Sequence, residues 1–301
     1  MSVLAVGVFD GLHRGHRALI DRARALAGDG RCVAVSFDPH PDIVLAKEFR
    51  AIAPLTPLPE KQERLAAMGV ELHVLPFTRE LAALSPEEFV ERHLVGPFAP
   101  RVLVVGADFA LGRGRAGNVE RLRAIGAGHG FTVEAVDLLG EDGEIVSSSR
   151  IRAALAEGRV GDAARWLGRR YSLVGLVVHG DKIGRTLGWP TANLRLHDEK
   201  AVPALGIYAV WARIAGEQVW RAGAMSVGIR PTFDGKLRTL EVHLLDWDGD
   251  LYGRDVEVQF VEWLRPELKF DGRDALVAAI AADVEKTRVR LADPANAPEE
   301  R

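Results

Sequence analysis

The sequence has little cysteine, no long apolar run and no large excess of one charge. Cys32 is the only cysteine among 301 residues, which excludes an intrachain disulfide, and its apolar neighbours are those of a buried strand residue. No apolar stretch approaches the ~20 residues of a transmembrane helix. The apolar N-terminus lacks the basic segment of a signal peptide, and the net charge of −3 indicates no nucleic-acid or membrane partner. We therefore expect a cytoplasmic protein.

The chain has the length and composition of a globular protein with about two domains of roughly 100–200 residues each. Up to about residue 137, short β-branched runs alternate with helical patterns. Strands that are apolar on both faces and separated by helices indicate a parallel sheet with crossover helices, so the first domain is predicted to be α/β and Rossmann-like. Ser85-Pro86-Glu87-Glu88 marks one helix start as a capping box. The expected strands are 4–9, 32–37, 71–75, 102–105 and 131–136, and the expected helices are 15–27, 58–68, 85–94 and 117–128.

The pattern changes after a helical segment around residues 150–157 and a short basic helix that ends near Arg169-Arg170. Closely spaced strands then follow, and a long helix is predicted only at the end, over about 272–291. Many strands without intervening helices indicate an antiparallel barrel or sandwich with one closing helix. We predict a first domain of residues 1–158 and a second of 159–301. The expected strands of the second domain are 172–178, 207–214, 218–222, 224–229, 240–246 and 255–261.

The first expected strand runs directly into G-V-F-D-G-L-H-R-G-H, where a helix begins. Such a turn places backbone N–H groups and the positive end of a helix at the sheet edge where anions bind. His13 and His16 can share one face of the first helical turn, and Gly15 leaves the backbone open to a phosphate. Two neutral imidazoles suit the stabilisation of charge on a transferring phosphoryl group. The alternative is zinc, which needs further cysteine or histidine ligands, and only His40 is an obvious addition.

Three further segments fall where such a site would need them. S-F-D-P-H-P ends the second expected strand and carries Asp38 and His40, and V-G-A-D-F-A-L-G ends the fourth and carries Asp108. S-S-S-R-I-R, from Ser147 to Arg152, opens a helix with hydroxyls and arginines suited to the outer phosphates of a triphosphate. Each segment alone is also what a helix cap or a turn looks like. Together, on loops at one sheet edge, they favour a site.

The second domain contains a glycine-spaced loop followed by W-P-T-A-N, which ends at Asn193. Glycines permit close approach of the backbone to phosphates, and Lys182 adds charge. A Walker A loop is rejected because the spacing is too short and no long helix follows. Thr191 and Asn193 offer two neutral oxygens to a Mg²⁺ ion that keeps its waters and bridges ATP phosphates, although a proline turn starting a strand has the same pattern. The glycines of this loop are Gly180, Gly184 and Gly188.

A carboxylate base is expected near a hydroxyl that accepts a phosphoryl group. In L-E-V-H-L, strand alternation puts Glu241 and His243 on one face and the apolar residues on the other. Periodicity alone indicates only a half-exposed strand.

The four motifs of the first half resemble, in order, those of the FMN adenylyltransferase domain of bifunctional riboflavin kinase/FAD synthetases, within the H-x-G-H nucleotidyltransferase superfamily. The resemblance implies that His13 and His16 bind and stabilise the ATP phosphates and that Ser147, Ser148 and Arg152 form a second phosphate-binding element. It also implies that Asp38, His40 and Asp108 lie near the nucleotide and flavin. The remaining residues that it assigns to ATP are Gly7, Phe9, Asp10 and Gly15.

W-P-T-A-N, S-V-G-I-R-P-T-F, L-E-V-H-L-L-D, D-L-Y-G and L-R-P-E-L-K-F-D are similar to the riboflavin kinase module of the same enzymes. That likeness implies a six-stranded barrel in which Thr191 and Asn193 bind MgATP. Glu241 would be the base that deprotonates the ribityl 5′-hydroxyl, and Arg265 and Glu267 would lie near the isoalloxazine.

The resemblance implies two reactions: ATP and riboflavin give FMN and ADP, then ATP and FMN give FAD and pyrophosphate. Two alternatives stay open at this point. One is a nucleotidyltransferase with another acceptor and an added β-domain, which would have no reason to carry Thr191, Asn193 and Glu241. The other is a non-catalytic flavin-binding protein that keeps the folds without the activity.

Overall fold

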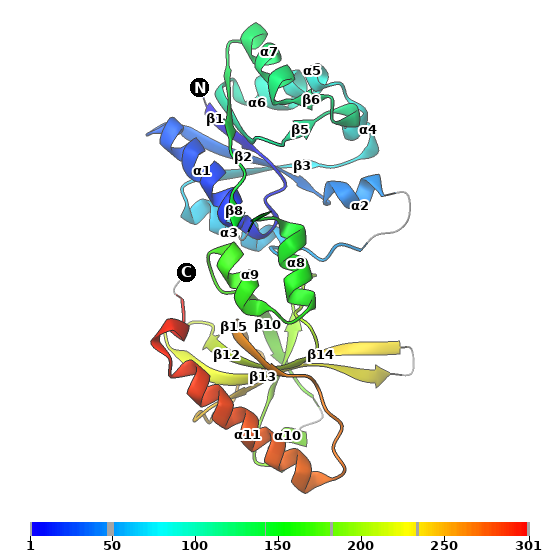
Figure 1. The fold of residues 1–301 in the computed structure, drawn as a ribbon, viewed down its shortest axis with the longest axis vertical. Coiled ribbons are helices and arrows are strands. Elements are labelled where there is room, and N and C mark those ends of the chain that lie inside the picture. The colour runs from blue at the N-terminus through cyan, green and yellow to red at the C-terminus, as the bar shows by residue number, and fades with distance from the viewer. Residues whose placement is uncertain (1, 47–50, 142, 181–182, 233–234, 300–301) are drawn as a thin grey trace. The chain divides into compact units, whose positions relative to one another are not determined.

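A computed structural model describes residues 2–46, 51–141, 143–180, 183–232 and 235–299 of the chain. The chain divides into two compact units, Met1–Ser148 and Ser149–Arg301, and each has its own sheet (Figure 1). Within the described ranges, none of the helices combines the length and the apolar character needed to cross a membrane.

The first unit is built on a five-stranded parallel sheet in the order β3-β2-β1-β4-β7. The strand order reverses between β1 and β4, and in open α/β sheets such a switch point is where ligands bind, beyond the carboxyl ends of the strands. The turn that carries the H-x-G-H motif therefore begins at the switch point. The strands are β1 (Ser2–Val6), β2 (Arg31–Asp38), β3 (Glu71–Pro76), β4 (Pro100–Gly106) and β7 (Thr132–Val136).

Alternate residues of these strands feed two apolar cores, one on each face of the sheet. Leu4 and Val6 face the core covered by α5 and α7, whereas Val3 and Ala5 face the core covered by α1 and α3. Cys32 is buried in this second core, and burial raises the pKa of its thiol, as expected for an inert side chain. The helices are α1 (Arg14–Ala27), α2 (Pro41–Leu45), α3 (Leu58–Ala67), α4 (Arg79–Ala83), α5 (Pro86–Phe89), α6 (Gly96–Phe98) and α7 (Val119–His129).

Shorter elements complete the first unit. A π-helical turn, Val90–Val95, continues α5, and the 3₁₀ turns are Asp10–Leu12 and Arg113–Arg115. Two small antiparallel ladders pair β5 (Ala110–Leu111) with β6 (Gly117–Asn118) and β8 (Gly140–Glu141) with β9 (Glu144–Ile145).

The second unit is a closed antiparallel barrel in the order β10-β11-β14-β13-β12-β15. The fold class predicted from the sequence, a parallel α/β sheet followed by a six-stranded barrel with a terminal helix, is confirmed. The strands are β10 (Ser172–Val178), β11 (Ala192–Leu196), β12 (Gly206–Ile214), β13 (Trp220–Thr232), β14 (Gly235–Leu244) and β15 (Asp255–Arg265).

In the barrel, the strand prediction is wrong at Gly223 and in omitting β11. The segments 218–222 and 224–229 are one continuous strand, β13, because Gly223 lies within the ladder, where an added Cβ would come 3.1 Å from the carbonyl oxygen of His243. A glycine inside a strand can mark a close approach of another backbone instead of a strand end. The sixth strand, β11, was not predicted because proline precedes it and it is short.

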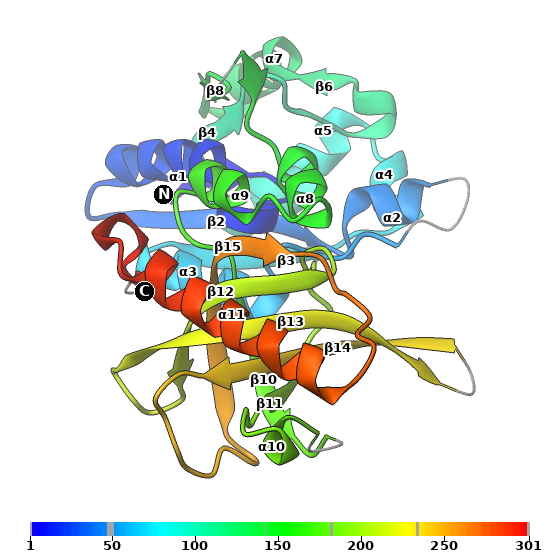
Figure 2. The same ribbon diagram turned by 60° about the horizontal axis from the view of Figure 1, so that its bottom comes forward.

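Helices flank the barrel at both ends of its sequence. The unit begins with α8 (Ser148–Ala156) and α9 (Val160–Leu167), and α9 packs on β15. The long helix α11 (Arg273–Leu291) lies along the barrel and packs on β12, β13 and β15 (Figure 2). A short helix, α10 (Ile183–Thr186), precedes β11, and a 3₁₀ turn, Pro294–Asn296, follows α11.

Candidate active sites

The histidine pair lies in the turn between β1 and α1. His13 is the N-cap of α1, and its Nδ1 accepts a hydrogen bond from the backbone N–H of His16 at 3.3 Å. Because Nδ1 is an acceptor, a neutral His13 carries its proton on Nε2. The two imidazoles are stacked, with ring centroids 3.6 Å apart and planes 17° apart. The structure thus brings the two histidines together at the start of a helix, as the sequence predicts.

His16 has a buried ring nitrogen, Nδ1, without a hydrogen-bond partner among the described residues. Burial lowers the pKa of His16 well below its ordinary value, and the nearby His13 and Lys61 lower it further. His16 is therefore a neutral imidazole at physiological pH. A buried polar atom left without a partner is an expected feature of a ligand site.

The turn before the histidines has an unusual backbone. Phe9 and Leu12 have positive φ angles of 53° and 42°, which non-glycine residues rarely adopt. The ring of Phe9 is fully buried and meets His16 edge-on. Gly7 makes room for that ring, since an added Cβ would lie 3.1 Å from it, and a Cβ on Gly15 would lie 3.3 Å from the ring of His13. Both glycines therefore leave space for side chains of the turn itself.

Asp10 anchors this turn to two other segments. Its carboxylate is buried and accepts hydrogen bonds from the backbone N–H groups of Leu55 and Thr56 at 2.9 and 3.1 Å. Its backbone carbonyl accepts a hydrogen bond from the hydroxyl of Ser148 at 2.8 Å. Asp10 thus has a structural task, and the S-S-S-R-I-R segment begins beside the turn. Ser147 immediately precedes α8, and Arg152 lies on α8 in the second unit, so its role stays a prediction.

The other predicted residues of the first unit follow the ends of β2 and β4. Asp38 ends β2 and is exposed, and His40 caps α2 by accepting a hydrogen bond from the N–H of Asp42 at 3.1 Å. Asp108 is exposed just after β4, and its carbonyl accepts a hydrogen bond from Arg115. Both carboxylates thus lie at the carboxyl ends of strands, Asp38 at the end of β2 and Asp108 just after β4.

Sequence reasoning missed a buried polar group beneath the turn. Lys61 on α3 is 6% exposed, and its Nζ donates to the carbonyl of Val8 at 2.8 Å and to the hydroxyl of Ser36 at 3.3 Å. The hydroxyl of Thr56 is buried without a hydrogen-bond partner among the described residues. The available signals were weak: Ser36 is a hydroxyl inside an apolar strand, and Lys61 shares a helix face with the core residue Leu65.

In the second unit, the predicted Thr191, Asn193 and Glu241 come together on the outer face of the barrel. Asn193 on β11 lies directly opposite Glu241 on β14. The hydroxyl of Thr191, which immediately precedes β11, donates to the Glu241 carboxylate at 3.2 Å. The guanidinium of Arg230 on β13 lies 3.8 Å from the other carboxylate oxygen. Arg230 was missed as a site residue, although the S-V-G-I-R-P-T-F motif contains it.

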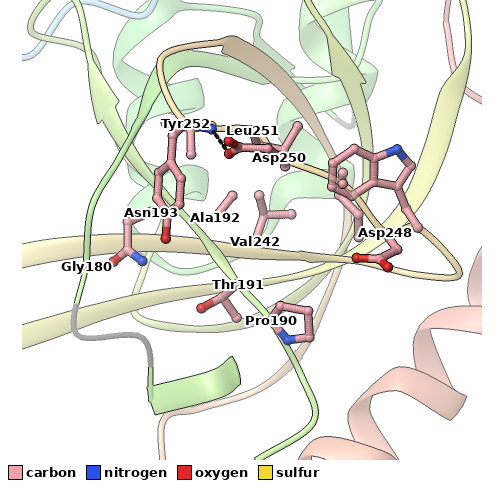
Figure 3. Close-up of a pocket in the computed structure, with 14 residues that line it drawn as sticks. Gly180, Pro190, Thr191, Ala192, Asn193, Val242, Asp248, Asp250, Leu251 and Tyr252 are labelled. Carbon is pink, nitrogen blue, oxygen red and sulfur yellow. Dashed lines mark hydrogen bonds between the residues drawn. The ribbon is translucent and has the colours of Figure 1, made fainter. Parts of the chain in front are cut away.

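Thr191 and Asn193 also line a cavity of about 430 Å³. Figure 3 shows these two residues with Tyr252 around the cavity, and Trp247 and Leu251 add to its apolar wall. Sequence reasoning missed these three wall residues, although Leu251 and Tyr252 belong to the D-L-Y-G motif. The cavity combines an aromatic wall with a few polar groups, as small-molecule sites commonly do.

The glycine-spaced loop packs tightly against the W-P-T-A-N segment. An added Cβ on Gly180 would lie 2.4 Å from the amide of Asn193, and one on Gly184 would lie 2.4 Å from the carbonyl oxygen of Trp189. Gly188 has φ of +86° and open space around it. Lys182 lies outside the described residues. The first two glycines therefore let the loop approach Asn193 and Trp189 closely.

Arg265 and Glu267 occupy different surroundings. The guanidinium of Arg265 forms a two-pronged ion pair with Asp283 of α11, with N–O distances of 2.6 to 3.1 Å. Glu267 lies over Gly228 of β13, where an added Cβ would come 2.4 Å from its carboxylate oxygen. Arg265 thus ties β15 to α11, while Glu267 lies on the outer face of the barrel that also carries Glu241.

The two units differ in the donor atoms that they offer to a metal ion. No group of three or more His, Cys, Asp or Glu side chains suited to a metal occurs among the described residues, so a zinc cluster around the histidines is not found there. Thr191 and Asn193 instead present a hydroxyl and an amide oxygen beside a cavity with room for a hydrated ion and phosphates. Few neutral oxygen ligands are what Mg²⁺ takes when it keeps most of its waters.

Both halves of the chain match known protein families. The FAD synthetase model matches residues 1–150, and the riboflavin kinase model matches residues 167–291. A bifunctional riboflavin kinase/FMN adenylyltransferase of Listeria monocytogenes is 38% identical over 295 residues, which are 97% of this chain and 93% of the relative. The enzyme of that name from Pseudomonas fluorescens is 42% identical over 98% of this chain and 94% of its own.

A solved structure has the same fold over nearly the whole chain. The crystal structure of a protein from Streptococcus pneumoniae, named as a macrolide-efflux protein, superposes with a TM-score of 0.88 and 33% identity, covering 95% of this chain and 94% of that one. The Escherichia coli relative, again named a bifunctional riboflavin kinase/FMN adenylyltransferase, is 39% identical over 93% of this chain. With relatives at this level of identity along nearly its full length, the chain belongs to the family of bifunctional riboflavin kinase/FMN adenylyltransferases.

Proposed function

We propose that this protein makes FAD from riboflavin in two ATP-dependent steps. The second unit phosphorylates riboflavin to FMN, and the first unit transfers AMP from ATP to the phosphate of FMN and releases pyrophosphate. The observation that carries the proposal is the presence of two separate polar groups in one chain of this family. One is the stacked His13 and His16 at the switch point, and the other is the Thr191, Asn193 and Glu241 group on the barrel.

In the adenylyl transfer, an oxygen of the FMN phosphate attacks the α-phosphorus of ATP, and the bond to the β-phosphate breaks as pyrophosphate leaves. The nucleophile is already anionic, so positioning and charge stabilisation suffice and no base is needed. His13 and His16 donate hydrogen bonds to phosphate oxygens as neutral imidazoles. The first N–H groups of α1 add their positive end to the same place. As neutral donors, the two imidazoles act through their N–H dipoles, whose positive ends face the negative charge on the phosphate oxygens.

The remaining groups of the first unit are assigned by position. Gly7, Phe9 and Asp10 shape the turn, and Gly15 makes room for His13 at the start of α1. The hydroxyls of Ser147 and Ser148, with Arg152, are proposed to hold the outer phosphates of ATP. Side chains at the ends of β2 and β4 are proposed to lie near the nucleotide and flavin, namely Asp38, His40 and Asp108.

In the kinase reaction, the nucleophile is the neutral ribityl 5′-hydroxyl. Glu241 accepts its proton while the hydroxyl oxygen attacks the γ-phosphorus, and ADP leaves. Thr191 and Asn193 would hold Mg²⁺, which neutralises charge on the ATP phosphates when bound. The hydroxyl of Thr191 already holds the Glu241 carboxylate at 3.2 Å, so the base and the metal-binding side are aligned with each other.

The flavin and the nucleotide need separate places around Glu241. The cavity beside Thr191 and Asn193 is proposed to take ATP, with the loop of Gly180, Gly184 and Gly188 over the phosphates. Glu267 lies on the Glu241 face of the barrel and is proposed to contact the isoalloxazine. Arg265 is proposed to act beside it while held by Asp283.

We further propose that the adenylyltransferase domain spans residues 1–158 and the kinase domain 159–301, since the two matched ranges lie on either side of that boundary. A cytoplasmic location belongs to the same proposal, because ATP is the donor in both steps.

Product analysis tests the proposal directly. The purified protein is incubated with riboflavin, ATP and Mg²⁺, and the flavins are separated by chromatography. FMN should form first and FAD later, with ADP and pyrophosphate as the other products. Formation of neither flavin nucleotide would refute the proposal, and FMN without FAD would refute its first-unit half.

A further inference from the structure

Lys61 is a buried lysine whose ammonium hydrogen-bonds the start of the histidine turn and the neighbouring strand β2. Lysine is rarely buried unless its ammonium is paired. Here the Nζ of Lys61 donates to the carbonyl of Val8 at 2.8 Å and to the hydroxyl of Ser36 at 3.3 Å. The hydroxyl of Ser36 donates to the same carbonyl at 2.9 Å. One ammonium on α3 thus joins the end of β1 to β2.

The carbonyl of Val8 is the last one before the strained part of the turn. Phe9 and Leu12 hold positive φ angles there, and such conformations persist only where the surroundings over-determine them. Two buried groups do so: Lys61 holds the residue before Phe9, and the carboxylate of Asp10 holds the backbone of residues 55 and 56. His13 begins directly after Leu12, so its position depends on this turn.

We propose that Lys61 is a positioning residue for the adenylyl transfer: its ammonium clamps the turn to β2 and so fixes His13 and His16 toward the phosphates. The inference rests on the proposed function of the first unit and adds to it a residue that does not touch the reacting atoms. Charge-assisted hydrogen bonds such as that of Lys61 are stronger than neutral ones, which suits a clamp on a strained turn.

The charge of Lys61 also acts on the protonation of His16. The groups that face this region are His13 from the start of α1, Asp10 from the turn and Asp38 from β2. Burial lowers the pKa of Lys61, while Asp10 and Asp38 favour its charged form. The charge of Lys61 in turn lowers the pKa of His16, after burial and His13. Removing that charge should raise the pKa of His16, so that His16 protonates at a higher pH.

The test replaces Lys61 by methionine and compares two reactions of the same chain. FAD formation from FMN reports the first unit, and FMN formation from riboflavin reports the second. Gln62→Met places the same side chain at the exposed neighbouring position and is the matched control. In Lys61→Met, kcat for FAD formation should fall about 10- to 100-fold, as expected for loss of a hydrogen bond from a buried charged group. FMN formation should stay unchanged in both variants, and Lys61→Arg should recover part of the FAD-forming rate.

The pH profile separates positioning from mere stability. In Lys61→Met, the acid limb of FAD formation should move to higher pH. A loss by the same factor at every pH would overturn the proposal, as would a normal rate. If Lys61→Met does not fold, Ser36→Ala carries the test, because it keeps the charge and removes one partner. That variant should lower the FAD-forming rate several-fold without moving the acid limb, and an unchanged rate would overturn the inference. Failure of the unaltered protein to form FAD would instead refute the proposed function.

Discussion

The two units hold their polar groups in opposite ways. In the first, His13, Asp10 and Lys61 are all less than a tenth exposed and lie around a strained turn. In the second, Glu241 is 29% exposed and stands on the outer face of a regular barrel beside an open cavity. The difference follows the chemistry proposed for each. An anionic phosphate needs dry, fixed hydrogen-bond donors, whereas a neutral hydroxyl needs a carboxylate within reach that can take its proton.

The largest effect should come from removing the base of the second unit. Glu241→Gln keeps the shape of the side chain and removes its ability to accept a proton, so FMN formation should fall about 10²- to 10⁴-fold. FAD formation from supplied FMN should be unchanged, and both rates are measured by flavin chromatography. Glu262→Gln, at a partly exposed glutamate paired with Arg290, is the control and should alter neither reaction. A normal rate of riboflavin phosphorylation in Glu241→Gln would show that the base is assigned wrongly.

The mirror experiment removes a donor from the first unit. His16→Ala should lower FAD formation from FMN about 10²- to 10³-fold, since one preorganised hydrogen-bond donor to a transition-state oxygen is worth that much. FMN formation should remain unchanged, because the kinase site lies in the other unit. His129→Ala, at the exposed end of α7, is the matched control. If His16→Ala slowed both reactions alike, the assignment of one reaction to each unit would be contradicted.

A smaller effect is expected from the loop of the second unit. In Gly180→Ala, the new Cβ would collide with the amide of Asn193, now 2.4 Å from where it would stand. Overpacking of this kind should lower FMN formation about tenfold, mostly as a higher KM for MgATP. Gly161→Ala in the same unit has open space and an ordinary helical backbone, so its kinetics should not change. An unchanged KM in Gly180→Ala would argue that Asn193 does not bind the nucleotide complex.

The smallest effect is a pH dependence of the stability of the first unit. The folded pKa of His16 lies well below 6.5, so the unfolded chain takes up a proton below pH 6.5 while the folded unit does not. The unit should therefore lose stability as the pH falls from about 6.5 toward the folded pKa. Thermal unfolding followed across that window should show a slope that His16→Asn reduces. FAD formation should keep its rate through pH 6.5, and an acid limb centred there would contradict a neutral, buried His16.

Much of the architecture could be predicted because its signals are local. The five parallel strands, the terminal helix and the helix start at Ser85 follow from apolar runs and caps. The capping box forms as predicted, with the hydroxyl of Ser85 accepting from the N–H of Glu88 at 3.2 Å. Gly223 misled the prediction because a glycine inside a ladder and a glycine at a turn look the same along the sequence. The difference lies in His243, which belongs to another strand.

The candidate sites likewise combine features that the sequence shows locally with features that depend on the tertiary structure. The His13 and His16 pair could be placed from the sequence alone, because a strand, a turn and a helix lie in succession and the family motifs follow in order. The sequence could not show that Lys61 is buried or that Arg230 lies 3.8 Å from Glu241. Those facts depend on which face of a helix meets the sheet and which strands become neighbours. The sequence by itself determined the fold class and the residues that can carry the chemistry. Only the tertiary structure decided which of these residues are buried, paired or open to a ligand. Burial and pairing depend on contacts between residues that lie far apart along the chain.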